Sequence, residues 1–213
     1  MIQEKISNKK IKLVWADTNK DFIKYIATEA VNWHNHPVVD GFCQDFSEPE
    51  TLYEIARGIK EIKGLPGKIG IIYHPDPRGL KMEKLQSPVR IIERLKMGKK
   101  VTGDCDDKVF FLSTCLLNRG YEVKVIGAHY VKPGSDPNSI NHTYLEFKKP
   151  EDKNWIPLDP SARKGIFGVK PASVYPIVKY KCTPEMLSVK KVAANVEVSE
   201  NVSESLKEVL WEM

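Results

Sequence analysis

The sequence lacks clustered cysteines, a long apolar run and a strong charge bias. Its four cysteines are widely separated and form no CxxC pair, which argues against a zinc ribbon and a disulfide-stapled fold. No stretch approaches the roughly 18 consecutive apolar residues of a membrane span, and lysine and asparagine interrupt residues 1–15, unlike the apolar core of a secretory signal. We therefore expect reduced thiols, a cytoplasmic location and no membrane partner.

Charge and hydrophobicity are those of a globular protein. The 33 Lys and Arg and the 28 Asp and Glu leave a formal net charge of +5, and 41% of the 213 residues are hydrophobic. The basic pairs at 99–100 and 148–149 have no interleaved aromatic residues, so nucleic-acid binding is not indicated. A chain of this length is expected to form one large domain, or one domain with a small appendage.

Apolar spacing and capping residues predict helices in the first half of the chain. A stripe at 22, 26, 30 and 33 predicts a helix over 18–33. The Ser-x-x-Glu box at 47–50 predicts a second helix that ends at Gly64. Ser87, Pro88 and Gly98 bracket a third helix. The β-branched segment 68–73 fits either a strand or an extended connector.

The second half predicts a helix followed by a sheet. Residues 109–117 form an apolar helical run, and residues 121–131 alternate like a strand. After a turn-rich loop, residues 142–147 and 155–159 are expected to be consecutive antiparallel strands. The fold class predicted is α+β, with a helix packed on an antiparallel sheet.

Cys105 stands where a glycine-containing turn enters the apolar helix. Unpaired N–H groups and the positive end of the helix dipole favour a thiolate there. Asp104, Asp106 and Asp107 are negative neighbours that would raise the thiol pKa, so a nucleophilic Cys105 needs a basic partner. The alternative is that the three aspartates only cap the helix and that Cys105 is a small buried hydrophobe.

His142 is the best-placed base among the five histidines. It opens a predicted strand, and Asp159 ends the next one, so antiparallel pairing would bring the two side chains together. Cys105 could then pass its proton to His142, with Asp159 orienting the imidazole. His129, near the far end of the preceding strand, is the rival base. The alternative is that His129 is an ordinary strand histidine.

Five motifs follow one another along the chain: Gly103-Asp104-Cys105, Arg119-Gly120-Tyr121, the strand 123–127, Asn141-His142-Thr143-Tyr144-Leu145-Glu146 and Trp155-Ile156-Pro157-Leu158-Asp159-Pro160. In this order they resemble the transglutaminase-like superfamily, especially its phage and prophage members with Gly-Asp-Cys-Asp-Asp. The resemblance covers residues 67–163 and implies Cys105 as nucleophile, His142 as general base and acid, and Asp159 as the orienting carboxylate. Thr143 departs from the aromatic residue that often follows the histidine, and no side-chain oxyanion donor is identifiable.

The resemblance implies a papain-like core at 67–183, preceded by an N-terminal helical extension at 1–66 and followed by a polar tail at 184–213. It further implies a cysteine-dependent amide-bond enzyme, either a protease or amidase or an acyltransferase, acting on a protein or peptide. The alternative is an inactive phage-type structural protein, which could be virion-associated. No cofactor is expected, because the cluster of His34, His36 and Cys43 lacks a fourth metal ligand and the aspartates around Cys105 lack a calcium-loop pattern.

Overall fold

A long central helix, α5 (Cys105–Asn118), packs against an antiparallel sheet. The computed structural model describes residues 11–14, 18–59, 61–67, 69–75, 83–131, 134 and 136–187. Its main sheet has the strand order β7-β6-β5-β8, and every neighbouring pair is antiparallel. The strands are β5 (Glu122–Tyr130), β6 (His142–Lys148), β7 (Ile156–Leu158) and β8 (Val174–Lys181). The α+β prediction is confirmed.

Two short strand pairs lie beside this sheet. β1 (Ile11–Val14) pairs antiparallel with β3 (Glu83–Gln86), and β2 (Ile71–Tyr73) pairs parallel with β4 (Val101–Gly103). β4 leads almost directly into α5. The segment that fitted either a strand or a connector is therefore the strand β2, and its last residue lies beside the turn that carries Cys105.

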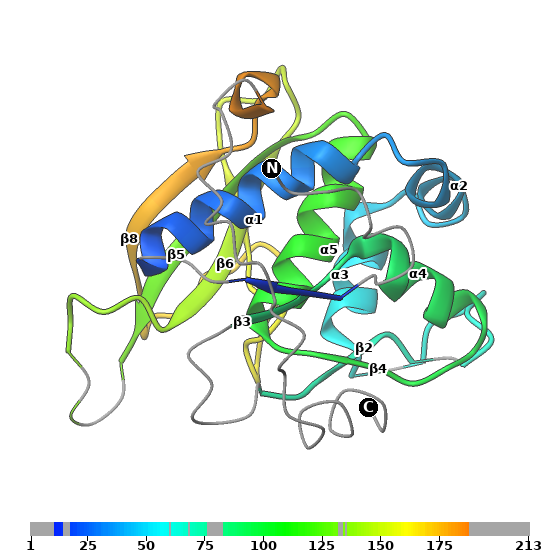
Figure 1. The fold of residues 1–213 in the computed structure, drawn as a ribbon, viewed down its shortest axis with the longest axis horizontal. Coiled ribbons are helices and arrows are strands. Elements are labelled where there is room, and N and C mark those ends of the chain that lie inside the picture. Colours follow the sequence, from blue (N-terminus) through cyan, green and yellow to red (C-terminus); the bar gives the residue numbers. More distant parts are fainter. Residues whose placement is uncertain are drawn as a thin grey trace, which may run out of the picture.

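Helices surround α5 on the sides that the sheet leaves open (Figure 1). They are α1 (Asn19–Trp33), α2 (Pro37–Asp45), α3 (Pro49–Arg57) and α4 (Pro88–Lys96). α1 contacts both α5 and β5, while α2, α3 and α4 contact α5. A single apolar cluster runs from Phe22 in α1 to Cys182 after β8. Within the described residues, the predicted N-terminal extension (1–66) and the predicted core (67–183) therefore contribute to the same apolar cluster.

Several predicted elements are present with the expected ends. Thr18 caps α1 through its side chain, and Ser87 caps α4 with Pro88 at the first helical position. Cys105 lies at the N-terminus of its helix, as predicted: α5 begins there, before the apolar run 109–117, and Asp104 caps it. A short 3-10 turn, η1 (Pro184–Leu187), opens the predicted polar tail. The remainder of that tail lies outside the described residues.

The second helix differs from its prediction. Ser47 and Glu50 form no capping box, since Glu48 is the N-cap residue of α3 and makes no side-chain cap bond. α3 ends at Gly58, not at Gly64, because Gly58 adopts a left-handed conformation with φ of 64°. The helix α2 was not predicted at all, although Pro37 occupies its first turn and the His36 side chain caps it.

Gly58→Ala is expected to destabilise the fold far more than Gly120→Ala. Both glycines have a positive φ, so an alanine is strained at either position. A Cβ at Gly58 would also lie 2.1 Å from the carbonyl oxygen of Ile71, whereas a Cβ at Gly120 would meet nothing within 4 Å. In urea unfolding we expect Gly58→Ala to cost at least about 2 kcal/mol more than Gly120→Ala. Equal costs would contradict this packing of α3 against β2.

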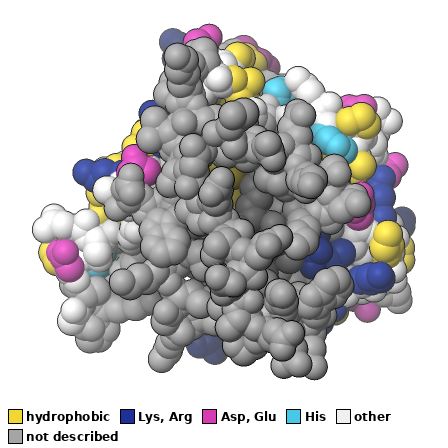
Figure 2. Space-filling view, viewed as in Figure 1, with side chains coloured by type: hydrophobic (Ala, Val, Ile, Leu, Met, Phe, Trp, Pro, Cys, Tyr) yellow, Lys and Arg dark blue, Asp and Glu magenta, His cyan; other side chains and the backbone are white. Residues whose placement is uncertain are grey.

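Charged side chains of both signs are dispersed around the rim of the face seen in Figure 2. None of the helices in the described part of the chain is long and apolar enough to cross a membrane.

Candidate functional site

A histidine and an aspartate meet at one edge of the sheet. His142 Nε2 lies 2.7 Å from Asp159 Oδ2, and their side chains are only 12% and 2% exposed. A carboxylate accepts hydrogen bonds but does not donate them, so Nε2 carries the proton in this pair. The other ring nitrogen, Nδ1, is left as the basic atom. The structure therefore brings together two of the three residues singled out in the sequence.

Strand register produces this pair. His142 is the first residue of β6, and Leu145 of β6 is paired with Leu158 of β7. Asp159 follows Leu158 directly, which places it near the start of β6, as the sequence predicted. This agreement follows from antiparallel geometry, in which the end of one strand lies beside the start of its partner.

Both the carboxylate and the main-chain carbonyl of Asp159 accept hydrogen bonds from the surrounding chain. Oδ1 accepts the backbone N–H groups of Ser161 and Ala162, each at 3.1 Å. Its main-chain carbonyl accepts the hydroxyl of Tyr53 from α3 at 3.2 Å. These contacts fix the carboxylate, so Oδ2 has a defined direction toward His142. Tyr53 was not identified from the sequence, because nothing local distinguishes it from an ordinary core tyrosine.

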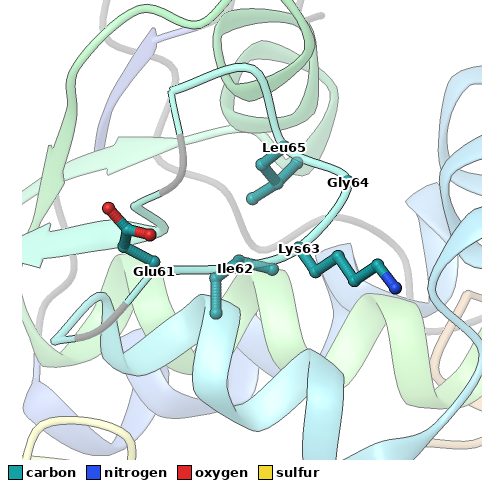
Figure 3. Close-up of a pocket in the computed structure, with 5 residues that line it drawn as sticks. All are labelled: Glu61, Ile62, Lys63, Gly64 and Leu65. Atoms are coloured by element: carbon teal, nitrogen blue, oxygen red, sulfur yellow. The ribbon is translucent and has the colours of Figure 1, made fainter.

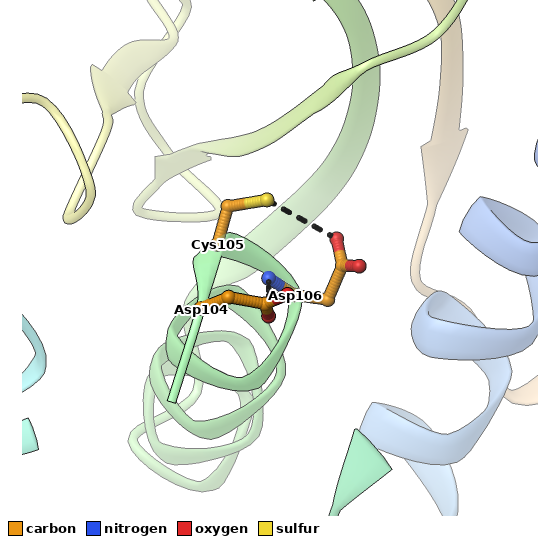
Figure 4. Close-up of side chains that lie close together, drawn as sticks. All are labelled: Asp104, Cys105 and Asp106. Carbon is orange, nitrogen blue, oxygen red and sulfur yellow. Dashed lines mark hydrogen bonds between the residues drawn. The ribbon is translucent and has the colours of Figure 1, made fainter. Parts of the chain in front are cut away.

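Cys105 begins α5, and Asp104 caps that helix by accepting the N–H of Asp106 at 3.1 Å. The thiol donates a hydrogen bond to Asp106 Oδ1 at 3.6 Å (Figure 4). The backbone N–H of Thr143, the residue after His142, donates to the sulfur. Among the described residues no hydrogen bond joins Cys105 to His142. The sulfur thus lies against the start of β6 with its proton directed at Asp106.

The environment of Cys105 favours a protonated thiol. Burial raises its pKa well above the ordinary value, and the carboxylates of Asp106 and Asp104 raise it further. The Thr143 N–H acts in the opposite direction, because it stabilises the thiolate. The helix end alone therefore does not activate this sulfur, as expected from the neighbouring aspartates.

Asp106→Asn is expected to speed alkylation of Cys105 by iodoacetamide at mildly alkaline pH. Removing this negative charge lowers the thiol pKa, so more thiolate is present at a given pH. Peptide mass spectrometry across a pH series measures the change. The matched control is Asp40→Asn, which alters the acidic first turn of α2 instead. An unchanged alkylation curve for Asp106→Asn would contradict the charge effect.

Two further side chains come close to the site. Lys108 is 1% exposed, and its ammonium donates to the carbonyl of Arg57 at 2.9 Å. Burial lowers the pKa of Lys108 to about 8, and charge on Asp159 and Cys105 acts against this shift. Tyr73, at the end of β2, has its ring 5.8 Å from the Lys108 nitrogen. Neither was predicted, since a lysine in an amphipathic helix is normally on the surface.

Three other histidines, His129, His34 and His36, make contacts away from this site. His129 is buried, and its Nδ1 lies 3.1 Å from the carbonyl oxygen of Ser139. His34 Nδ1 lies 2.6 Å from the carbonyl of Val31, and His36 caps α2. His34, His36 and Cys43 form no metal-ligand group among the described residues. Of the two histidines weighed as bases, His142 is the one that contacts Asp159.

One potential ligand group involves the site itself. Single ligand atoms of Asp104, Cys105 and Asp106 lie within 4.8 Å of one another. The bond from the Cys105 thiol to Asp106 and the capping bond to Asp104 both run within this group. These bonds are the ones expected at a capped helix start. The three ligand atoms are also fewer than the number of oxygen ligands that Ca²⁺ takes.

The surface hollows lie elsewhere. A hollow of about 390 Å³ is lined by five consecutive residues, Glu61 to Leu65 (Figure 3). A second hollow, of about 250 Å³, lies between the start of α3 and the far end of β6, and Phe147 and Phe167 are among its lining residues. Neither hollow contains Cys105, His142 or Asp159.

No known family model matches the chain, and no curated protein matches it. What the chain does is therefore inferred from its own residues.

Proposed function

We propose that this protein is a cysteine-dependent amide-bond enzyme with a papain-like, transglutaminase-like core. Cys105 is the nucleophile, His142 the general base and acid, and Asp159 the carboxylate that orients His142. A protein or peptide is the substrate class. The observation that carries the proposal is the hydrogen-bonded pair of His142 Nε2 and Asp159 Oδ2, at 2.7 Å. His142 begins β6, and the backbone N–H of the next residue in that strand, Thr143, donates a hydrogen bond to the Cys105 sulfur.

The chemistry follows from these positions. The thiol turns from Asp106 toward His142, and its proton passes to Nδ1 as Sγ bonds to the substrate carbonyl carbon. The carbonyl π pair moves onto oxygen. When the C–N bond breaks, His142 returns the proton to the departing amine, and a thioester remains on Cys105. Water or a second amine then attacks the thioester, releases the product and restores the thiol.

The raised thiol pKa supports a mechanism in which the base acts during attack. A thiol that is protonated in the resting protein is not a nucleophile until a base removes its proton. His142 has the required form, because Asp159 holds the proton on Nε2 and leaves Nδ1 basic.

The reaction is tested with p-nitrophenyl acetate, an activated ester that acetylates a thiol without requiring a particular peptide. We expect a burst of p-nitrophenolate and one acetyl group on Cys105, detected by peptide mass spectrometry. Cys105→Ser is the control for the other three thiols. If Cys105 is acetylated no faster in the native protein than in urea, the enzymatic proposal is wrong and the inactive structural protein replaces it.

A glutamine-containing peptide with a labelled primary amine separates the two resolving steps. Incorporation of the label without hydrolysis indicates acyl transfer. Hydrolysis without incorporation indicates a protease or amidase. The two outcomes share the same acyl-enzyme and differ only in which nucleophile reaches it.

A further inference from the structure

Tyr73 lies over the first turn of the helix that carries Cys105. β2 and β4 are paired in parallel, and Tyr73 is directly opposite Gly103, two residues before Cys105. The backbone N–H of His74 donates to the carbonyl of Gly103 at 3.0 Å, so this pairing extends to the end of β2. The position of Tyr73 is therefore fixed relative to the start of α5.

The ring direction is set by a second contact. Lys108 follows Cys105 by three residues in α5, so the two side chains share one face of the helix. The Lys108 ammonium is 5.8 Å from the centre of the Tyr73 ring. Lys108 is almost completely buried, while Tyr73 is 51% exposed. The tyrosine ring thus covers the lysine and lies on the helix face that also bears Cys105.

The Tyr73 hydroxyl is an available donor near the nucleophile. Among the described residues none accepts a hydrogen bond from it. Burial raises the pKa of Tyr73 to about 12, and charge on Cys105 and the site aspartates acts in the same direction. The Tyr73 phenol consequently keeps its proton at neutral pH. No acceptor in the described part of the chain, backbone or side chain, binds this proton.

Gln86, a side-chain amide that contacts the first turn of α5 at Asp107, already uses its donors within the fold. The Gln86 side-chain amide donates to the Thr102 carbonyl at 2.6 Å and to Asp107 Oδ2 at 3.1 Å. Both of its N–H groups are therefore used within the fold. The thioester chemistry still needs a side-chain donor at the oxygen that becomes negative during attack.

We propose that the Tyr73 hydroxyl and the backbone N–H of Cys105 form the oxyanion hole of this site. The inference rests on the proposed function. When Sγ bonds to the carbonyl carbon, the π pair moves to the carbonyl oxygen, which then accepts hydrogen bonds from the Tyr73 O–H and from the first-turn N–H of α5. No proton is transferred from Tyr73, and both bonds weaken when the carbonyl re-forms and the leaving group departs.

Tyr73→Phe tests this assignment because it keeps the ring over Lys108 and removes only the hydroxyl. We expect the rate of Cys105 acetylation by p-nitrophenyl acetate to fall on the order of 10²-fold. Alkylation of Cys105 by iodoacetamide should be unchanged, since displacement of iodide forms no oxyanion. Tyr175→Phe is the matched control, because Tyr175 is also exposed and also has a lysine nitrogen 5.8 Å from its ring centre.

The outcomes separate this assignment from the proposed function. If wild-type Cys105 is acetylated and Tyr73→Phe matches its rate, the tyrosine assignment is overturned and the enzyme proposal stands. If the variant slows alkylation as much as acetylation, Tyr73 acts on the thiol and not on an oxyanion, which also overturns the assignment. If wild-type Cys105 is not acetylated at all, the proposed function fails, and the oxyanion hole fails with it.

Discussion

Asp159→Asn is expected to slow acetylation of Cys105 by on the order of 10³- to 10⁴-fold while leaving the protein folded. An asparagine can still accept the N–H groups of Ser161 and Ala162, which now bond to Oδ1. Its amide nitrogen would face His142 Nε2 and donate to it. The imidazole proton would then move to Nδ1, and His142 could no longer accept the thiol proton.

Two measurements attribute this result to the loss of the bond between Asp159 and His142, and not to unfolding or to the removal of any carboxylate. Urea unfolding should give Asp159→Asn a stability near that of wild type, and Asp152→Asn, in an exposed turn, should keep full acetylation activity. A folded Asp159→Asn protein that is acetylated at the wild-type rate would show that the bond to Asp159 has no part in the reaction.

Lys108→Met is expected to change how stability depends on pH. Burial lowers the pKa of Lys108 from 10.5 to about 8, so between these values the unfolded chain binds a proton that the folded chain does not. Wild-type stability should therefore rise with pH across this window. The cost of burying the charge is fully present below pH 8 and is lost toward pH 10.5. The difference in unfolding free energy between wild type and variant should shift by up to about 3 kcal/mol.

Subtracting the two curves removes the titration of every other group. Urea unfolding from pH 7 to pH 10.5 supplies the data, and Lys96→Met, at a lysine whose side chain is 44% exposed, provides the control. A constant difference between wild type and Lys108→Met across this range would show that Lys108 keeps an ordinary pKa in the folded protein.

Local signals account for the parts of the fold that were predicted. The cap residues of α1 and α4 act on N–H groups a few positions away, so they can be recognised within one turn. The pairing of His142 with Asp159 was also predictable, because consecutive antiparallel strands place one strand's end beside the other's start. In each case the interacting residues are close in sequence or joined by one turn.

Two elements, α2 and β8, were not predicted because each contains a proline that fits more than one local structure. Pro37 follows the end of α1 closely, and a proline fits both the chain after a helix and the first turn of the next helix, which here is α2. β8 contains Pro176, which disfavours a central strand, and β8 tolerates it because it is an edge strand. In both cases the local sequence could not decide between the two structures, because the choice depends on the neighbouring elements.

The site was predicted only in part because several of its contacts cross the chain. Lys108 is buried against a carbonyl 51 positions earlier, at Arg57, and nothing near Lys108 in the sequence indicates this. Tyr73 reaches α5 through parallel pairing of β2 with β4, whose register has no tight turn to reveal it. The aspartates beside Cys105 were different, since their effect on its pKa depends only on adjacent positions.

Whether His142 activates Cys105 is measured by alkylation of Cys105 with iodoacetamide across a pH series, in wild type and in His142→Ala. Peptide mass spectrometry follows Cys43, Cys115 and Cys182 in the same samples as buried controls. Wild-type Cys105 is expected to react faster than these thiols near neutral pH, and His142→Ala is expected to slow it at least about tenfold and to shift its reaction to alkaline pH. Identical curves for Cys105 in the two proteins would contradict an activated Cys105–His142 pair.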